Sequence, residues 1–254
     1  MKYTHILNPN SGLQSILHPI LGPKEIIDLT GRVAVVTCGA LDIGYEVSRA
    51  FALNGARVIM IDVFGGIKER ESRLDLLILA AGINANAYGE SADGIDRIFA
   101  VNWLGYSYAV CLLYPLICKT SKIPNTSPPR ITFESSELHR INDPSKDPTQ
   151  LYARTKLAMI LGAKYGLIER AIKPNNDNIY ALMEIAYPGL VGKLISTVMT
   201  TFGRSPKQGS FSMIYAATSP EVERKGWNGY YFIDPGQPGT ELMMANDVEL
   251  GNAL

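Results

Sequence analysis

The stretch VAVVTCGALDIGYEVSRAFALNGARVIMID, residues 33–62, holds two short apolar runs on either side of a segment with helical spacing. Val33–Thr37 is apolar and β-branched, as is typical of a strand buried on both faces of a parallel sheet. Gly44–Asn54 has apolar residues at helical intervals, and Asn54-Gly55 is a helix stop signal. Arg57–Asp62 repeats the buried-strand pattern. The stretch therefore predicts a strand–helix–strand unit with a right-handed parallel crossover.

The same alternation continues along the chain. The patterns predict strands at 76–80, 130–133, 179–185 and 229–233 and helices at 95–118, 152–171, 194–201 and 209–218, with a charged connector at 67–74 and a Ser/Pro-rich loop at 119–129. This alternation, without repeats or a linker, predicts an α/β fold with a single doubly wound, Rossmann-like parallel sheet. Residues 1–28 carry several Pro and Gly and little periodicity, so we expect an irregular arm before a domain at 29–254.

The totals exclude several classes of function. The chain has 254 residues with 24 basic and 24 acidic side chains, so its charge does not favour nucleic acid or an anionic membrane. Its 3 cysteines lack metal-site spacing, its 3 histidines are scattered, and no signal peptide or membrane span is recognised. We expect a soluble cytoplasmic protein without a metal, and with a small molecule as its partner.

One pair of residues indicates acid–base chemistry. Tyr152 and Lys156 are four residues apart and would lie on the same face of a helix. An unperturbed phenol titrates near pH ~10, and a fixed ammonium beside it stabilises the phenolate. Such a pair is a general acid/base for a hydroxyl or carbonyl substrate. The same spacing is more often an exposed amphipathic pair, so other segments must support the functional interpretation.

Several of these segments together resemble the short-chain dehydrogenase/reductase family, closest to its retinol-dehydrogenase-like branch. The resemblance runs from Ile27 to Asp234 and rests on the order and spacing of its motifs. They are the lead-in DLTGRV at 28–33, the helix and strand around GYE at 44–46 and NGARVIM at 54–60, VNWLG at 101–105, SSELHR at 135–140, the Tyr152–Lys156 pair and the Pro-Gly turn at 188–189.

The resemblance implies a role for each motif residue. Tyr152 would exchange a proton with the substrate oxygen, with Lys156 stabilising its phenolate. Ser136 would hold that oxygen, and Asn102 would anchor a water that links Lys156 to solvent. The residues expected at the substrate are Ser135, His139, Tyr187 and Lys193, and those at a retained cofactor are Gly39, Ile43, Gly44, Asp62 and Gly82. Without the family match, Asn102 reads as an ordinary helix residue, the serines as loop caps and His139 as a loop residue.

The phosphate loop departs from the family pattern. The family loop resembles Thr-Gly-x-x-x-Gly-x-Gly, whereas residues 37–44 read TCGALDIG. Cys38 takes the place of the first glycine and Asp42 that of the middle one, while Gly44 remains. Those glycines let the backbone approach a pyrophosphate at a helix N-terminus. Two unit charges ~4 Å apart repel by roughly 4 kcal/mol at an effective dielectric of about 20, so a carboxylate at position 42 opposes the anion.

Further departures also affect the cofactor side. After Asp62 the family has a helix, a strand and another helix that build much of the adenine pocket, and only the connector to Asp75 stands in their place. The family's Asn-Ala-Gly reads AAG at 80–82, and Lys193 replaces a threonine that would contact the nicotinamide. Asp62 stands where an acidic residue would bind an NAD ribose, but it equally suits a cap for the turn at 65–66, which we favour.

Three hypotheses about function follow. The first is an enzyme that keeps the proton-transfer residues but has lost hydride transfer, and that needs no cofactor. It would catalyse an isomerisation, dehydration or cyclisation, pericyclic closure included, of a small apolar natural-product-like compound. The second is a divergent NAD(P)(H)-dependent alcohol dehydrogenase or ketone reductase. The third is a non-catalytic binding relative, which would have no need of the Asn/Ser/Tyr/Lys set.

The deletion after Asp62 also leads to expectations about what covers the exposed part of the sheet. Removing two helices bares sheet surface, and a large bare apolar patch is uncommon in a soluble monomer. We expect residues 1–28 to fold over part of it. We also expect a homodimer through the helices at 95–118 and 152–171, since relatives of the family commonly pair there.

Overall fold

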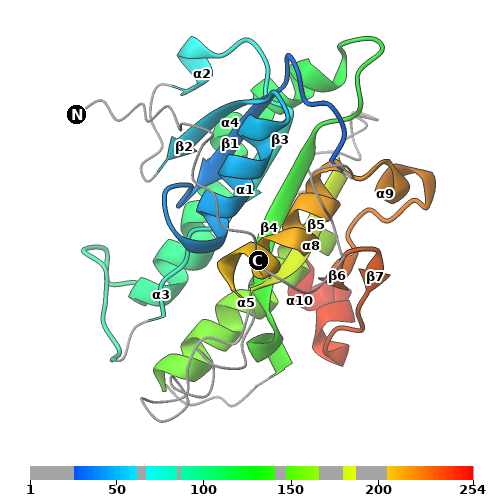
Figure 1. Cartoon of the computed structure of the whole chain (residues 1–254). Coiled ribbons are helices and arrows are strands. Elements are labelled where there is room, and N and C mark those ends of the chain that lie inside the picture. Colours follow the sequence, from blue (N-terminus) through cyan, green and yellow to red (C-terminus); the bar gives the residue numbers. More distant parts are fainter. Residues whose placement is uncertain are drawn as a thin grey trace.

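A mostly parallel sheet forms the centre of the molecule (Figure 1). The computed structural model describes residues 26–61, 67–84, 87–140, 147–165, 180–186 and 205–253. Its 7-stranded sheet has the order β2-β1-β3-β4-β5-β6-β7, with every neighbouring pair parallel except β6 and β7. The strands are β1 (Val33–Thr37), β2 (Arg57–Ile61), β3 (Leu76–Leu79), β4 (Arg130–Ser136), β5 (Tyr180–Ala186), β6 (Tyr231–Asp234) and β7 (Gln237–Pro238). The predicted α/β, Rossmann-like fold is confirmed.

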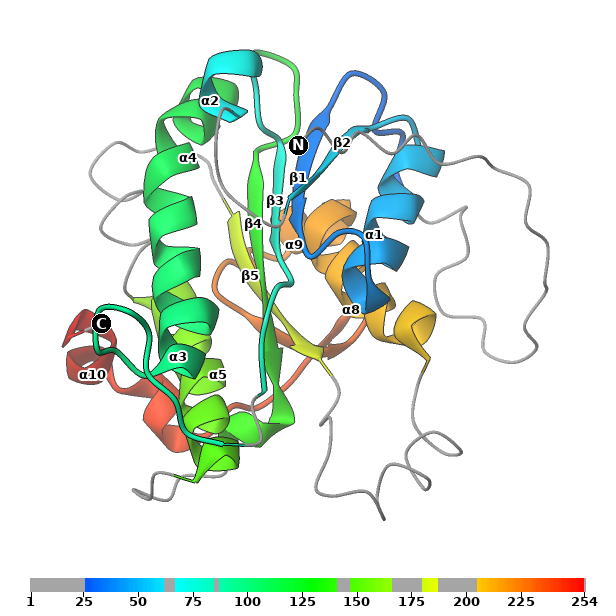
Figure 2. The same ribbon diagram turned by 90° about the vertical axis from the view of Figure 1, so that its left-hand side faces the viewer.

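Helices cover both faces of this sheet (Figure 2). Helices α4 and α5 lie on one face and α1 and α8 on the other, which is the arrangement that parallel crossovers produce. The helices are α1 (Asp42–Leu53), α2 (Ile67–Arg70), α3 (Arg97–Phe99), the π-helical η1 (Ala100–Leu104), α4 (Gly105–Ser121), η2 (Glu137–Arg140), α5 (Pro148–Lys164), α8 (Pro206–Thr218), α9 (Pro220–Arg224), η4 (Met243–Asn246) and α10 (Val248–Ala253).

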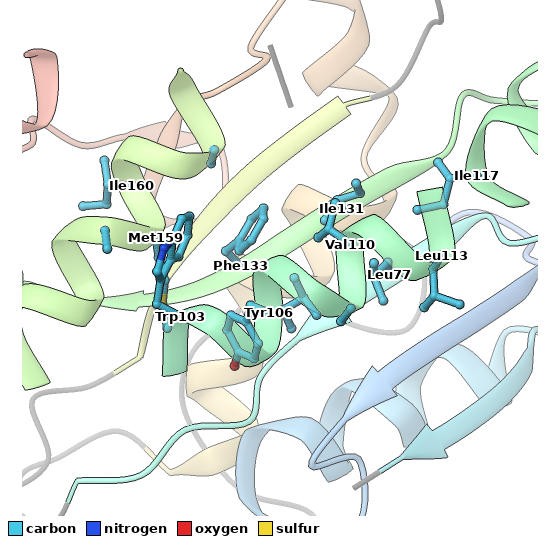
Figure 3. Close-up of a cluster of buried hydrophobic side chains, with 14 of the residues drawn as sticks. Leu77, Trp103, Tyr106, Val110, Leu113, Ile117, Ile131, Phe133, Met159 and Ile160 are labelled. Atoms are coloured by element: carbon cyan, nitrogen blue, oxygen red, sulfur yellow. The ribbon is translucent and has the colours of Figure 1, made fainter. Parts of the chain in front are cut away.

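Alternate residues of each strand pack into two separate cores. On β1 the side chain of Val35 joins the core under α4 and α5, whereas Ala34 and Val36 join the core under α1 and α8. On β4, Ile131 and Phe133 belong to the first core, which Figure 3 shows around Trp103 and Met159. This alternation tells which face each residue at the carboxyl end of β4 occupies.

Several element boundaries differ from the sequence prediction. Helix α1 begins at Asp42 and α5 at Pro148, where Asp147 caps the helix by accepting from the Thr149 N–H at 2.9 Å. Strand β4 extends to Ser136, so both serines belong to the strand rather than to a loop after it. The expected helix at 194–201 lies outside the described residues, as does the part beyond residue 165 of the helix expected at 152–171.

Strand β2 forms an edge of the sheet instead of a strand buried on both faces. Arg57 is exposed and the next four side chains are only partly buried, because the described strands pair with β2 on one side alone, through β1. In the doubly wound order 3-2-1-4-5-6 a further strand lies outside the second one. No described strand takes that outer place, which agrees with the predicted deletion. The prediction that residues 1–28 cover this region falls, for 1–25, outside the described residues.

The segment Arg97–Ser121 is the one helix in the described residues that is long and apolar enough to cross a membrane. The most apolar stretch of this helix is 44% buried within the fold. From the sequence alone we did not recognise it as a candidate membrane span. Core helices of globular domains pass the same test, and Val110, Leu113 and Ile117 of this helix pack against the sheet (Figure 3).

Candidate active site

Helix α5 carries the tyrosine–lysine pair into the domain. Tyr152 is half-buried and Lys156 is only 1% exposed, and the Lys156 ammonium lies 5.2 Å from the centre of the Tyr152 ring. The ammonium donates a hydrogen bond of 2.9 Å to the main-chain carbonyl of Glu134, at the carboxyl end of β4. The two residues therefore share a helix face, as the spacing predicts, and that face meets the strand end.

The two serines at the end of β4 point to opposite faces of the sheet. Ser135 donates a hydrogen bond of 2.9 Å to the main-chain carbonyl of Lys156, which ties the strand to α5. Ser136 accepts from the Leu138 N–H at 3.2 Å and is on the face of the α1 and α8 helices. Because the Ser135 hydroxyl already donates its proton within the fold, we assign Ser135 a structural role instead of a substrate contact.

His139 is also engaged within the fold. It is 1% exposed, its Nδ1 lies 2.7 Å from the Ser136 carbonyl, and its Nε2 accepts from the Leu242 N–H at 3.2 Å. A carbonyl oxygen only accepts, so Nδ1 carries the proton and the imidazole is neutral. Its ring also packs against the Tyr231 ring at 78°. We assign His139 to holding the end of β4 in place.

Asn102 connects α5 with the segment after β3. It is fully buried in the π-helical turn, where it exchanges two hydrogen bonds with the Ile83 backbone and donates one of 3.2 Å to Thr155. A methyl group placed on Gly82 would lie 3.6 Å from Asn102 Oδ1 and 3.7 Å from Lys156 Nζ. Asn102 and Lys156 thus flank Gly82, which places the asparagine within the same site. Insertions of the π type often mark functional sites.

The loop before α1 keeps a glycine-like backbone without the glycines. Cys38 and Asp42 have φ angles of 52° and 45°, the left-handed region that glycine adopts most easily. A Cβ on Gly44 would lie 2.4 Å from the Cys38 carbonyl, and one on Gly39 would lie 2.7 Å from the Met60 side chain. Gly39 is therefore used to pack the loop against β2 rather than to admit a ligand.

Two carboxylates, those of Asp42 and Glu134, lie within electrostatic range in this part of the fold. Glu134 lies on the same face of β4 as Ser136, and Asp42 is the first residue of α1. Burial raises the pKa of Glu134 to about 7; the ammonium of Lys156 opposes this rise and the carboxylate of Asp42 adds to it. Burial also raises the pKa of Tyr106 well above its ordinary value, and the charge of Glu134 contributes. The charges of Lys156 and Asp42 therefore both act on Glu134.

These residues do not fit a dinucleotide. A pyrophosphate binds where backbone N–H groups and the positive end of a helix dipole meet a glycine-lined approach. Here Asp42 places a carboxylate at that helix end and Glu134 places a second one nearby, so the field repels an anion. Ile43 is partly buried in the core under α1 and α8, where a Cβ on Gly209 would lie 3.0 Å from its Cδ1. Asp62, Tyr187 and Lys193 lie outside the described residues.

Comparisons with known proteins give relatives that are named dehydrogenases, reductases and oxidoreductases. No family model matches the chain. Human retinol dehydrogenase 14 is 32% identical over a region that covers 65% of this chain and 52% of the dehydrogenase. Human WW domain-containing oxidoreductase is 27% identical over 81% of this chain and 62% of the oxidoreductase. The short chain dehydrogenase/reductase dpchH of Colletotrichum higginsianum is 24% identical over 84% of this chain and 70% of its own length. These relatives support assigning the chain to the short-chain dehydrogenase/reductase family.

Solved structures with this fold show the same architecture. A short chain dehydrogenase from Salmonella enterica has a TM-score of 0.58 at 17% identity, over 84% of this chain and 99% of that one. An uncharacterised protein from Mycobacterium paratuberculosis has a TM-score of 0.67 at 20% identity, over 91% of this chain and 93% of that protein. This short-chain dehydrogenase/reductase spans about half to three fifths of the length of the retinol dehydrogenase and the WW domain-containing oxidoreductase.

Two residues of the site were missed by the sequence analysis. Glu134 was placed at the end of a strand without a role, although an acidic residue in a run otherwise suited to burial was a usable signal. Tyr106 donates its hydroxyl to the Ala81 carbonyl from within α4 and was read as one of many apolar helix residues. Only the tertiary structure brings Glu134 within electrostatic range of Lys156 and of Tyr106.

Proposed function

We propose that this short-chain dehydrogenase/reductase transfers protons at the carbonyl or hydroxyl oxygen of a small apolar, natural-product-like molecule, without transferring hydride. The observation that carries the proposal is the pair of carboxylates, Asp42 and Glu134, beside an intact Ser136, Tyr152 and Lys156. A site built this way favours isomerisation, dehydration or cyclisation over redox chemistry. The proposed enzyme acts in the cytoplasm as a homodimer.

Each member of the set has one task in this proposal. The Tyr152 hydroxyl gives a proton to the substrate oxygen and takes it back later in the cycle. The Ser136 hydroxyl donates a hydrogen bond to the same oxygen and stabilises the negative charge that develops there. Lys156, held by the Glu134 carbonyl, keeps a positive charge beside the tyrosine ring. Asn102 holds the Ile83 segment and thereby the wall around Gly82.

A second candidate is an NAD(P)(H)-dependent alcohol dehydrogenase or ketone reductase. The names of the relatives favour it, since they include a retinol dehydrogenase and a WW domain-containing oxidoreductase. The left-handed backbone at Cys38 and Asp42 favours it too, because the loop keeps the conformation that glycines would take. When bound, such a cofactor would supply hydride to or from the carbon that bears the oxygen.

Titration with NAD(H) and NADP(H) separates the two candidates. We expect no binding at millimolar cofactor by calorimetry or by quenching of Trp103 and Trp227 fluorescence. Micromolar binding would overturn the proposal in favour of the redox candidate. Tyr152→Phe is expected to remove most turnover under both candidates, although a ring closure driven by shape would lose only part. A non-catalytic relative would bind its ligand equally well with tyrosine or with phenylalanine at position 152.

A further inference from the structure

Glu134 is a carboxylate of the site to which the proton transfer above gives no task. Along β4, Ile131 and Phe133 point into the core under α4 and α5. Arg130 lies on the other face, where it donates to the Ala216 and Ser219 carbonyls of the α8–α9 segment. Strand side chains alternate, so Glu134 shares the face of Arg130 and not that of Phe133.

This face is also the face of Ser136. Two residues of a parallel strand span about 6.6 Å, so the Glu134 carboxylate originates one strand repeat away from the hydroxyl that would hold the substrate oxygen. The Lys156 ammonium donates to the carbonyl of Glu134 itself at 2.9 Å. The side chain of Glu134 thus lies on the strand face of Ser136, and its main chain contacts Lys156.

The carboxylate of Glu134 has no structural task within the described part of the chain. Asp75, another acid at the end of a strand connection, is 1% exposed and accepts from the Val33 N–H at 2.8 Å and from Arg73. Glu134 accepts no side-chain hydrogen bond from the described residues, and only the charges of Lys156 and Asp42 act on it. Glu134 keeps part of its surface exposed, but an acid set into a strand of otherwise buried residues without hydrogen bonds lowers stability, and such groups concentrate at functional sites.

We propose that Glu134 is a second acid–base residue that moves a proton at carbon while Tyr152 and Ser136 act at oxygen. The inference rests on the proposed function and names its substrate class as enolisable ketones, β,γ-unsaturated ketones in particular. The carboxylate takes a proton from the carbon between the carbonyl and the alkene. That C–H electron pair forms a C=C bond as the C=O bond opens, and Tyr152 protonates the oxygen.

The return step balances the first. The O–H proton goes back to Tyr152, the C=O bond reforms, and the displaced electron pair takes the proton of the Glu134 carboxylic acid at the γ-carbon. The product is the conjugated α,β-unsaturated ketone. No electrons leave the substrate and both residues regain their starting protonation, so the step needs no oxidant, reductant or cofactor.

The electrostatic surroundings suit this task. Burial raises the pKa of Glu134 to about 7, against the ammonium of Lys156 from α5 and with a smaller contribution from the carboxylate of Asp42 from α1, so that both protonation states are populated at neutral pH. The charge of Glu134 in turn acts on Tyr106 of α4. A general base works best when its pKa lies near the operating pH.

The test uses 3-cyclohexen-1-one, whose conversion to the conjugated 2-cyclohexen-1-one is followed by absorbance, and cyclohexanone, whose α-protons exchange in D₂O by NMR. We expect the wild type to catalyse both, with rates rising through about pH 7. Glu134→Gln should lower both rates by about a hundredfold or more and remove that inflection. Glu134→Asp should recover part of the rate. Glu249→Gln on the exposed face of α10 is the matched control.

The outcomes separate this inference from the function on which it rests. Exchange that needs Tyr152 but continues in Glu134→Gln overturns the inference and leaves the proposed function standing. No exchange by the wild type overturns the inference, and micromolar NAD(H) binding in addition overturns the function. Carbon NMR of protein labelled at the glutamate carboxyls, with Glu134→Gln for assignment, reads the group directly. A Glu134 signal that titrates below pH 5 also overturns the inference.

Discussion

Single side chains account for most of what is unusual in this member of the family. Asp42 and Cys38 take left-handed backbone angles that glycine would take without strain, so the loop has kept its shape while changing its chemistry. Glu134 adds a carboxylate to the face of β4 that carries Ser136. At this scale the loop carries an acidic residue where the family pattern has a glycine.

A single substitution removes the negative charge that Asp42 adds to the loop before α1. Asp42→Asn keeps a residue type that tolerates the left-handed region and removes the charge at the start of α1. Because two unit charges ~4 Å apart interact by roughly 4 kcal/mol at a dielectric of about 20, we expect NADH to bind at least tenfold more tightly than to the wild type. Calorimetry measures this, with Asp93→Asn as the exposed control. Equal affinities in both variants would contradict the repulsion.

Glu134 also makes stability depend on pH. Its pKa in the folded protein, about 7, is above the ordinary value of 4.5, so the folded state holds the proton more tightly. The stability from this group is complete below about pH 4.5 and is lost as the pH rises through about 7. We expect Glu134→Gln to be more stable than the wild type at pH 8 by ~1–3 kcal/mol in urea unfolding, and equal to it near pH 4. The opposite pH trend would contradict this assignment.

Among the elements, α5 and the π-helical turn η1 hold the site together. Gly162 of α5 packs directly on Trp103 of η1: a Cβ there would lie 1.9 Å from the ring. Trp103 neighbours Asn102, and α5 carries Tyr152 and Lys156. The closeness of these two helices therefore sets the distance between the asparagine and the lysine.

A methyl group tests this packing. Gly162→Ala must push Trp103 away, and overpacking of this kind costs typically about 1–3 kcal/mol. We expect a lower midpoint of thermal unfolding, monitored together with Trp fluorescence. Gly105→Ala, where the added Cβ has its nearest neighbour at 3.6 Å, is the matched control and should be neutral or more stable by up to about 1 kcal/mol. Similar effects of both substitutions would argue against a close contact.

At the scale of the whole molecule, the exposed apolar surface bears on assembly. Helix α4 and the preceding turn present Val101, Leu104 and Tyr108, exposed to 40%, 37% and 64%, at intervals that place them on one stripe. Residues 151–163 of α5 are instead mostly buried, and η4 and α10 contact that helix. The α4 half of the predicted dimer interface is therefore open, while α5 is covered within the protomer.

We expect a homodimer that forms through the α4 stripe. Tyr108→Arg places a charge on the most exposed residue of the stripe and should shift the protein to monomers by light scattering, with the unfolding midpoint no longer dependent on protein concentration. Tyr230→Arg, a 44% exposed tyrosine away from α4, is the control and should leave the dimer intact. A monomeric wild type at high concentration would contradict the interface.

The sequence by itself determined the order of strands and helices, the Tyr152–Lys156 pair and the altered loop at 38–42, because each depends on residues close together in the chain. The two faces of β4 were decided by tertiary structure: Ser135 bonds to α5, while Ser136 and Glu134 share the other side. The engagement of His139 by Leu242 also depends on the fold. Local periodicity encodes neighbours within one element, whereas the sheet order decides which elements meet, and the acidic site exists only where they meet.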